Sequence, residues 1–264
     1  MRAHDIDFFI TGDDMQFVEI ELDPQESVVA EAGSMMMMNQ EIEMQTIFGD
    51  GSAQNDGLMG KLFSAGKRLL TGESLFMTVF TNRGYGKSRV AFAAPYPGKI
   101  IPLDLTEYQG KIICQKDSFL CAAKGVSVGI ELQRKLGVGF FGGEGFIMQK
   151  LEGDGLTFIH AGGTICEKIL QPGEVLKVDT GCLVAMTRDV QYDIEMVKGV
   201  KSILFGGEGL FFATLRGPGK VWIQSLPFSR LADRIFAAAP KAGGRSMEQG
   251  SILGGLGDLL DGDN

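Results

Sequence analysis

The chain repeats a stretch of its own sequence, and this repeat limits the folds open to it more than any other feature. The segment FGGEGFIMQKLEGDGLTFIHA at 141–161 aligns without a gap with FGGEGLFFATLRGPGKVWIQS at 205–225. A weaker copy, LTGESLFMTVFTNRGYG, lies at 70–86. Each copy consists of a glycine turn, an apolar strand, a second glycine turn and another strand, a pattern typical of short antiparallel strands. The repeat therefore predicts a β-rich module that occurs three times.

A second motif recurs with the same multiplicity. Its copies are DPQESVVAEAGSM from Asp23, CQKDSFLCAAKGV from Cys114 and DTGCLVAMTRDV from Asp179. In each copy a turn-forming polar group precedes an apolar strand. A short strand with a central Ile-Glu pair then follows, and its three copies, EIEM, GIEL and DIEM, lie at 41–44, 129–132 and 193–196.

The two motifs divide one β domain, residues 1–228, into three units. We place the units at about 15–110, 111–173 and 174–228. A single short β unit cannot bury its apolar face alone, so we expect the three to pack around one core. The predicted fold class is all-β: a β-sandwich built from three internal repeats with pseudo-threefold symmetry. Strands do not alternate with long helices, which argues against a doubly wound sheet.

One or two short helices are expected beside the strands. The first unit is longer by about twenty residues at 48–68, and the leucines at 56–70 lie near one face of a helix. Apolar residues also recur at helical spacing in PFSRLADRIFAAAP, with a proline as stop signal, which predicts a helix at 229–239. The remaining residues, 240–264, are glycine-rich and are expected to form a flexible tail.

Charge and hydropathy exclude several classes of protein. The net charge of −8 repels phosphate backbones at long range, so no nucleic-acid partner is expected. The N-terminal sequence MRAHDIDFFITGDD is interrupted by acids and does not read as a secretory signal. No segment approaches the ~18 apolar residues that predict a membrane-spanning helix. We therefore expect a cytoplasmic protein whose four cysteines stay reduced.

Three sequence blocks resemble a known family. LLTGESLFMTVF, FGGEGFIMQKLEGDG and GGEGLFFATLRGPGKVWIQS are similar to the altered-inheritance-of-mitochondria protein twenty-four family, and the resemblance covers about residues 8–228. It implies a β-sandwich related to the tryptophan RNA-binding attenuation protein fold. It implies no catalytic residues, since the family has none established and its bacterial members are of unknown function. Mitochondrial members are linked to inner-membrane organisation, which is only an analogy here, because function resides in sites rather than folds.

No motif predicts an enzyme, a cofactor or a metal. GVGFFG at 137–142 has the glycine spacing of a dinucleotide-binding loop, but a turn and a strand follow it where that loop requires a helix. No two cysteines have the Cys-x-x-Cys spacing of a zinc site. Cys166 and His160 could supply a nucleophile and a base, but His160 aligns with Gln224 in a strand of the repeat. We therefore predict no catalytic, cofactor-binding or metal-binding residues.

The cysteines are expected to be free and to fill apolar positions. On the motif alignment, two of them fall on apolar residues of the other copies: Ala30 and Val184 for Cys121, and Val28 and Phe119 for Cys182. A buried free cysteine behaves as a small apolar residue. Cys121 and Cys182 are therefore predicted to be buried.

Three glutamates recur in the glycine turns: Glu73, Glu144 and Glu208. If pseudo-threefold symmetry brings them together, their carboxylates can bind a hard cation or a basic partner. The alternative is that each carboxylate accepts hydrogen bonds from backbone N–H groups of its own turn, which need partners in every copy. We favour this alternative, and both hypotheses stay open.

Two other segments are candidates for binding. In SMMMMNQ at 34–40, strand alternation would bury two of the four methionines, and the alternative is an apolar patch that faces a partner. The extra segment of the first unit suits an amphipathic helix on a partner or an anionic membrane, and the alternative is a lid over a sheet edge. Its candidate binding residues are Leu58, Lys61, Leu62, Phe63, Lys67 and Arg68.

These observations favour a non-enzymatic scaffold or interaction protein. The expected partner is another protein or a second copy of the chain, and peripheral membrane contact is a further expectation. The alternative function is a small-molecule or metal-binding module that uses the repeated glycine–glutamate turns.

Overall fold

The computed structural model describes the chain at residues 2–31, 33–48, 76–134, 146–196 and 211–239. The chain divides into two compact units, Met1–Arg230 and Leu231–Asn264. All strands of the described residues belong to the first unit, so the chain is all-β as predicted. The described residues contain one α-helix, α2 (Phe228–Ala238), close to the position predicted from its apolar spacing. The helix predicted at 56–70 and the predicted tail lie outside the described residues.

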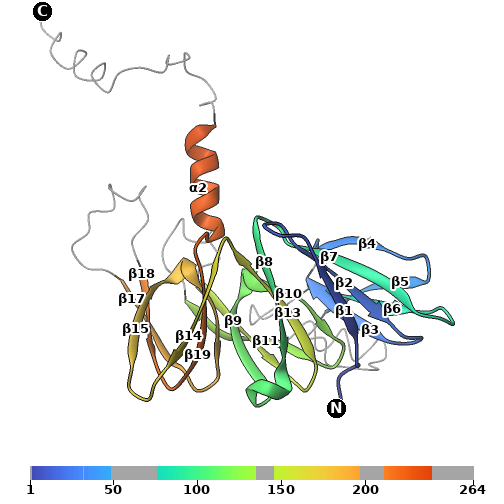
Figure 1. Ribbon diagram of the computed structural model, residues 1–264, viewed down its shortest axis with the longest axis horizontal. Coiled ribbons are helices and arrows are strands. Elements are labelled where there is room, and N and C mark those ends of the chain that lie inside the picture. Colours follow the sequence, from blue (N-terminus) through green and yellow to red (C-terminus); the bar gives the residue numbers. More distant parts are fainter. Residues whose placement is uncertain (1, 32, 49–75, 135–145, 197–210, 240–264) are drawn as a thin grey trace, which may run out of the picture. The chain divides into compact units, whose positions relative to one another are not determined.

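After a first strand, β1 (Asp7–Thr11), the strands fall into three successive sets of six, which Figure 1 colours from blue to orange. Set 1 contains β2 (Phe17–Leu22), β3 (Ser27–Glu31), β4 (Met35–Met38), β5 (Ile42–Phe48), β6 (Phe76–Asn82) and β7 (Ser88–Ala93). Set 2 contains β8 (Gly98–Asp104), β9 (Lys111–Gln115), β10 (Phe119–Ala123), β11 (Ser127–Arg134), β12 (Phe146–Glu152) and β13 (Leu156–Gly162). Set 3 contains β14 (Ile165–Leu170), β15 (Val175–Asp179), β16 (Leu183–Thr187), β17 (Gln191–Met196), β18 (Phe211–Arg216) and β19 (Gly219–Gln224).

The strands of the three sets pair in the same order. In each set the first, sixth and third strands lie side by side, and so do the fourth, fifth and second strands. All of these ladders are antiparallel. Consecutive sets are joined where β3 pairs with β10 and where β9 pairs with β16. These two junctions build the two six-stranded sheets of the first unit.

A bulge recurs at one place in the three sets. The third strand of each set gains one residue against the sixth strand. The extra residue lies between the members of three pairs: Met35 and Met37, Phe119 and Cys121, and Leu183 and Ala185. Because a bulge fixes the register of the strand that carries it, Met37, Cys121 and Ala185 are structural counterparts.

The described residues of the first unit form three apolar clusters, and the junction strands contribute to two clusters each. In β3, Val28 enters one cluster and Val29 enters the next. In β9, Ile112 and Ile113 divide in the same way. Successive side chains of a strand point to opposite faces. These strands are therefore buried on both faces, which accounts for their continuous apolar sequences.

The strand pairing moves two of the predicted boundaries by one strand. The units expected to begin at about 111 and 174 begin with the second strands, β9 and β15. The hydrogen-bonded sets begin with β8 and β14, because each first strand pairs with the sixth strand of its own set. The motifs start at second strands, so they assigned each first strand to the preceding unit. The pseudo-threefold axis stays a prediction. Strand order shows which strands are neighbours in a sheet, but it does not give the rotation that relates one set to the next.

The first copy of the second motif was aligned with the wrong strand. Its apolar part forms β3, a second strand, whereas the other two copies form the third strands β10 and β16. Ala30 is consequently the neighbour of Cys121 across the β3–β10 ladder and not its counterpart. The two strands look alike in sequence because both are buried on both faces. The Ile-Glu segments do lie in strands, at the fourth strand of each set: β5, β11 and β17.

Candidate functional site

The residues proposed from the sequence as binding residues lie outside the part of the chain that the structure describes. They are Glu73, Glu144 and Glu208 of the glycine turns, and Leu58, Lys61, Leu62, Phe63, Lys67 and Arg68 of the extra segment. Their roles stay predictions. The site described below comes instead from the methionine segment, for which a partner-facing patch was one of two interpretations.

All four methionines of β4 are exposed. Met35, Met36, Met37 and Met38 have relative exposures of 37%, 45%, 44% and 40%. The expectation that strand alternation buries two of them is wrong. Alternation buries a side chain only where a second layer covers that face. The four methionines therefore form an apolar strip at the surface, which we call the methionine strand.

The methionine strand is also the edge of its sheet. The sheet has the order β1-β2-β7-β4, so β7 is the neighbour of β4 on one side and no described strand lies on the other. An edge strand presents unpaired backbone N–H and C=O groups, which can pair with a strand from another chain. Methionine side chains suit such a contact, because they are flexible and fit irregular apolar surfaces.

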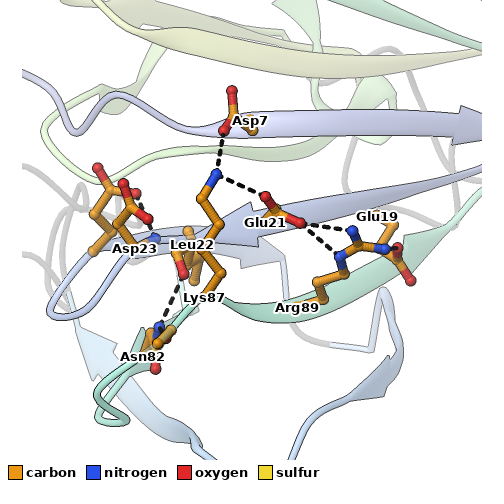
Figure 2. Close-up of polar contacts among 10 residues, drawn as sticks. Asp7, Glu19, Glu21, Leu22, Asp23, Asn82, Lys87 and Arg89 are labelled. Atoms are coloured by element: carbon orange, nitrogen blue, oxygen red, sulfur yellow. Dashed lines mark hydrogen bonds and ion pairs between the residues drawn. The ribbon is translucent and has the colours of Figure 1, made fainter.

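A chain of ion pairs covers the outer face of the same sheet (Figure 2). The Lys87 ammonium lies 3.1 Å from the Asp7 carboxylate and 2.8 Å from Glu21. The Arg89 guanidinium lies 2.7 Å from Glu21 and 2.8 Å from Glu19. Asp7, Glu19, Glu21 and Arg89 lie in β1, β2 and β7, and Lys87 directly precedes β7. In β2 and β7 the charged residues alternate with core residues. The strand pattern thus places charge outside and apolar residues inside.

The ion pairs favour the charged forms of Glu21, Lys87 and Arg89. Hydrogen bonds from Lys87 and Arg89 lower the pKa of the Glu21 carboxyl. The hydrogen bonds to Glu21 raise the pKa of both Lys87 and Arg89. Arg89 also lies 5.1 Å from the ring centroid of the exposed Phe9, a cation–π contact. Such mutually paired groups suit a stable polar surface and not general acid–base catalysis, which needs a group that titrates near the working pH.

A second edge strand lies in set 3. β15 is the outer strand of the three-stranded sheet β15-β18-β17, and among the described strands it pairs with β18 alone. Val175 is 45% exposed, and the Lys177 side chain is 60% exposed. β15 is the second strand of its set, as β3 and β9 are in theirs. A neighbouring set covers those two, whereas no described strand lies beyond β15.

The four cysteines are free, and two of them are buried. Cys114 and Cys121 are buried, and burial raises the pKa of both. Cys182 is half-buried, so the expectation that it is buried is wrong. It lies in the short turn Thr180–Cys182 before β16 and not in a strand. The described residues hold no group of three or more His, Cys, Asp and Glu side chains arranged for a metal ion.

His160 is a core residue. Its side chain is 1% exposed and its ring lies edge-on to Tyr96, with 4.5 Å between the centroids. Burial lowers the pKa of His160 to about 4. Cys166, its conceivable partner in catalysis, is exposed on β14. A buried neutral histidine and an exposed thiol do not form the hydrogen-bonded pair that nucleophilic catalysis requires.

Comparison with known proteins identifies the family. The model of the family described as mitochondrial biogenesis AIM24 matches residues 8–226. The chain belongs to this family. The match extends over all three sets of strands and so includes β4 and β15.

Two relatives of this AIM24-family chain come from Streptococcus pyogenes. The uncharacterized protein M6_Spy0233 of serotype M6 is 34% identical over 227 residues, which cover 84% of this chain and 86% of that protein. The crystal structure of protein SPYM3_0169 is similar with a TM-score of 0.68 and 26% sequence identity, and it covers 89% of this chain and 100% of the other. No helix in the described ranges has both the length and the apolar composition needed to cross a membrane.

Proposed function

We propose that this AIM24-family protein is a non-enzymatic scaffold or interaction protein that binds a protein strand at β4. The observation that carries the proposal is the exposure of four consecutive methionines on a sheet edge. Backbone hydrogen bonds from an added strand supply affinity, and side-chain contacts supply specificity. An exposed apolar strip at an unpaired edge favours association, because binding releases water from the apolar surfaces of both partners.

The proposal includes a finer description of the fold. We propose a tryptophan RNA-binding attenuation protein-like sandwich whose repeats are related by rotation, and a cytoplasmic, self-associating chain. The shared strand order and the shared bulge support the repeat relationship. Peripheral membrane contact and cation binding at the glycine turns depend on residues outside the described ranges, and no described residue favours them.

The test is a pair of substitutions in the methionine strand, Met36→Lys with Met38→Lys. Lysine on an edge strand disfavours pairing, because strand addition would desolvate its charge. We expect the variant to fold normally and to lose the proteins that copurify with the wild-type chain from its native cell. The measurement is affinity purification with mass spectrometry, with and without detergent.

Ile169→Lys is the matched control. Ile169 is 71% exposed and lies on β14, which is also the outer strand of its sheet. The substitution replaces an exposed apolar residue by lysine on another edge strand, with one added charge against two in the methionine variant, and should leave copurification unchanged. Equal losses in both variants would attribute the effect to charge in general, and unchanged copurification in the methionine variant would contradict the proposal.

A further inference from the structure

We propose that the strand that pairs with β4 is β15 of a second copy of this chain. The inference rests on the proposed function, because it names the partner of the same sheet edge. It comes from the way in which the three sets are already joined. Both strands are edges of their sheets among the described residues, and both belong to the strand types that form the junctions inside the chain.

The two internal junctions follow one rule. The second strand of one set pairs with the third strand of the next set: β3 with β10, and β9 with β16. Within the described residues, this rule leaves one second strand and one third strand without such a partner. They are β15, at the end of the series, and β4, at its beginning. A β15–β4 ladder between two copies would be a third junction of the same kind.

The internal junctions also share a register. In the first, Ala30, Val29 and Val28 lie opposite Cys121, Ala122 and Ala123. In the second, Cys114, Ile113 and Ile112 lie opposite Ala185, Met186 and Thr187. The bulge relates the third strands residue by residue, so Met37 is the counterpart of Cys121 and Ala185. The second strands are related through the fifth strands: Ala30, Cys114 and Val178 lie opposite Thr78, Gln149 and Ala213, which occupy one position of the sequence repeat. The same register places Val178, Lys177 and Leu176 of one copy opposite Met37, Met38 and Asn39 of the other.

The side chains fit this register on one face of the sheet. At the internal junctions the first pair, Ala30 with Cys121, points into the cluster of the preceding set. Val178 already belongs to the cluster of set 3. The same geometry directs Met37 of the second copy into that cluster. Met37 would then become covered on a face where it is now 44% exposed.

The other face of the proposed ladder explains why the contact would be weaker than those inside the chain. Val29 and Ile113 are buried at the internal junctions, and their counterpart in β15 is Lys177. A lysine at this place must keep its ammonium group in water, which costs part of the binding free energy. We therefore infer a reversible association that depends on protein concentration.

The new sheet would repeat the order of the central sheets. The strands of the two copies would run β17-β18-β15 and then β4-β7-β2, which is the order of β5-β6-β3 and β10-β13-β8. The contact joins two different surfaces and is therefore heterologous. Heterologous contacts build open chains, or rings where the rotation closes. Analytical ultracentrifugation over a concentration series should show species larger than a dimer.

Cross-linking between two singly substituted chains tests the register. Both chains carry Cys166→Ser and Cys182→Ser, which remove the cysteines that are not buried. One chain adds Met37→Cys and the other adds Val178→Cys. Directly opposed residues in a ladder have Cβ atoms about 4.5–5.5 Å apart, near the range in which a disulfide forms. Under mild oxidation we expect a mixed disulfide dimer from the two chains together, and little from either alone.

Two further combinations make the result specific. Asn39→Cys with Leu176→Cys is a second pair in register and serves if Val178→Cys destabilises the fold. Met38→Cys with Val178→Cys is out of register by one residue, so its side chains point to opposite faces and should not cross-link. Equal cross-linking of all combinations would contradict the proposal. A chain that carries both Met37→Cys and Val178→Cys and cross-links only within itself would show pairing inside one copy, and this too would overturn it.

Lys177→Ile provides an independent readout. It gives β15 an apolar residue where the internal junctions have Val29 and Ile113. We expect the dissociation constant of self-association to fall about tenfold or more. A wild-type chain that sediments as a monomer at every concentration, with no mixed disulfide, would overturn the inference. If the methionine-strand variant loses another protein while the wild-type chain is monomeric, the proposed function stands and this inference fails.

Discussion

Two methionines occupy the same place in two sets of strands, and they differ in burial. Met186 of β16 is fully buried, and Met38 of β4 is 40% exposed. The ladders place them in equivalent positions, opposite Val221 and Val90. β16 has β9 on its other side, whereas no described strand lies beyond β4. Burial at this position is therefore decided by the neighbouring set and not by the side chain.

The largest difference between a covered and an uncovered third strand is expected when a charged residue is placed in each. Ala122 of β10 is fully buried, and Met38 is its counterpart in β4. Ala122→Asp should lower the free energy of unfolding by about 4 kcal/mol or more, because it buries an unpaired carboxylate. Met38→Asp should change it by about 0.5 kcal/mol or less, as exposed substitutions do. Urea denaturation measures both, and similar losses would remove the distinction between covered and uncovered strands.

Truncation of the two methionines should give the next largest difference. Met186→Ala should cost about 2–5 kcal/mol, since it leaves a cavity in a packed core. Met38→Ala should cost about 0.5 kcal/mol or less at a protein concentration where the chain is monomeric. The melting temperatures of the two variants provide the measurement. A large loss for Met38→Ala in the monomer would mean that β4 is already covered.

The interior contains a histidine that makes stability depend on pH. His160 has a folded-state pKa of about 4 against an ordinary value of 6.5. Between these values the unfolded chain binds a proton that the folded chain does not, so stability falls as pH decreases from about 6.5 to about 4. His160→Gln should remove this part of the pH dependence. Denaturation at a series of pH values is the measurement, and an unchanged slope would contradict the assignment.

The repeat supplies a reason to expect that the glutamine variant folds. Gln224 is the counterpart of His160 in set 3 and is 4% exposed. Its amide oxygen accepts from the Gly162 N–H at 2.7 Å, and its amide nitrogen donates to the Gly181 carbonyl at 2.8 Å. A glutamine is thus accommodated at this place in one of the sets.

The smallest effect is expected for Cys121→Ala. Cys121 is fully buried, and its counterpart in set 3 is Ala185, so an alanine already fits the equivalent strand. We expect a loss of about 1 kcal/mol or less, because the substitution removes a single heavy atom from the core. Thermal denaturation measures the loss. A cost several times larger would show that the two strands are packed differently in spite of their shared register.

The sequence predicted where strands lie better than it predicted which strands of the three sets correspond to one another. The Ile-Glu segments were expected to be strands, and each lies in the fourth strand of its set. The alignment of Ala30 with Cys121 failed because β3 and β10 carry similar apolar sequences for the same reason, burial on both faces. A sequence pattern reports the environment of a strand. It does not report which of two similar environments the strand occupies.

The candidate site was predictable in kind and not in detail. The run of four methionines suggested an apolar patch, but alternation predicted that two would enter the core. The missing information was that β4 is an edge strand, which depends on pairing between residues distant in sequence. The charged residues of the outer face, among them Glu21 and Arg89, were not singled out. Their alternation with apolar residues in FVEIEL and SRVAFA was the signal that could have found them.

Val28 and Val29 are adjacent in β3 and belong to different apolar clusters. The same division in β9 means that each interior strand supports the set on both of its sides. Repeat proteins whose units touch only their neighbours often unfold unit by unit. Here the melting of one set would expose one buried face of a strand in the next set. The three sets are therefore expected to melt in a single cooperative transition. Deletion of one whole set is therefore expected to unfold the set beside it as well.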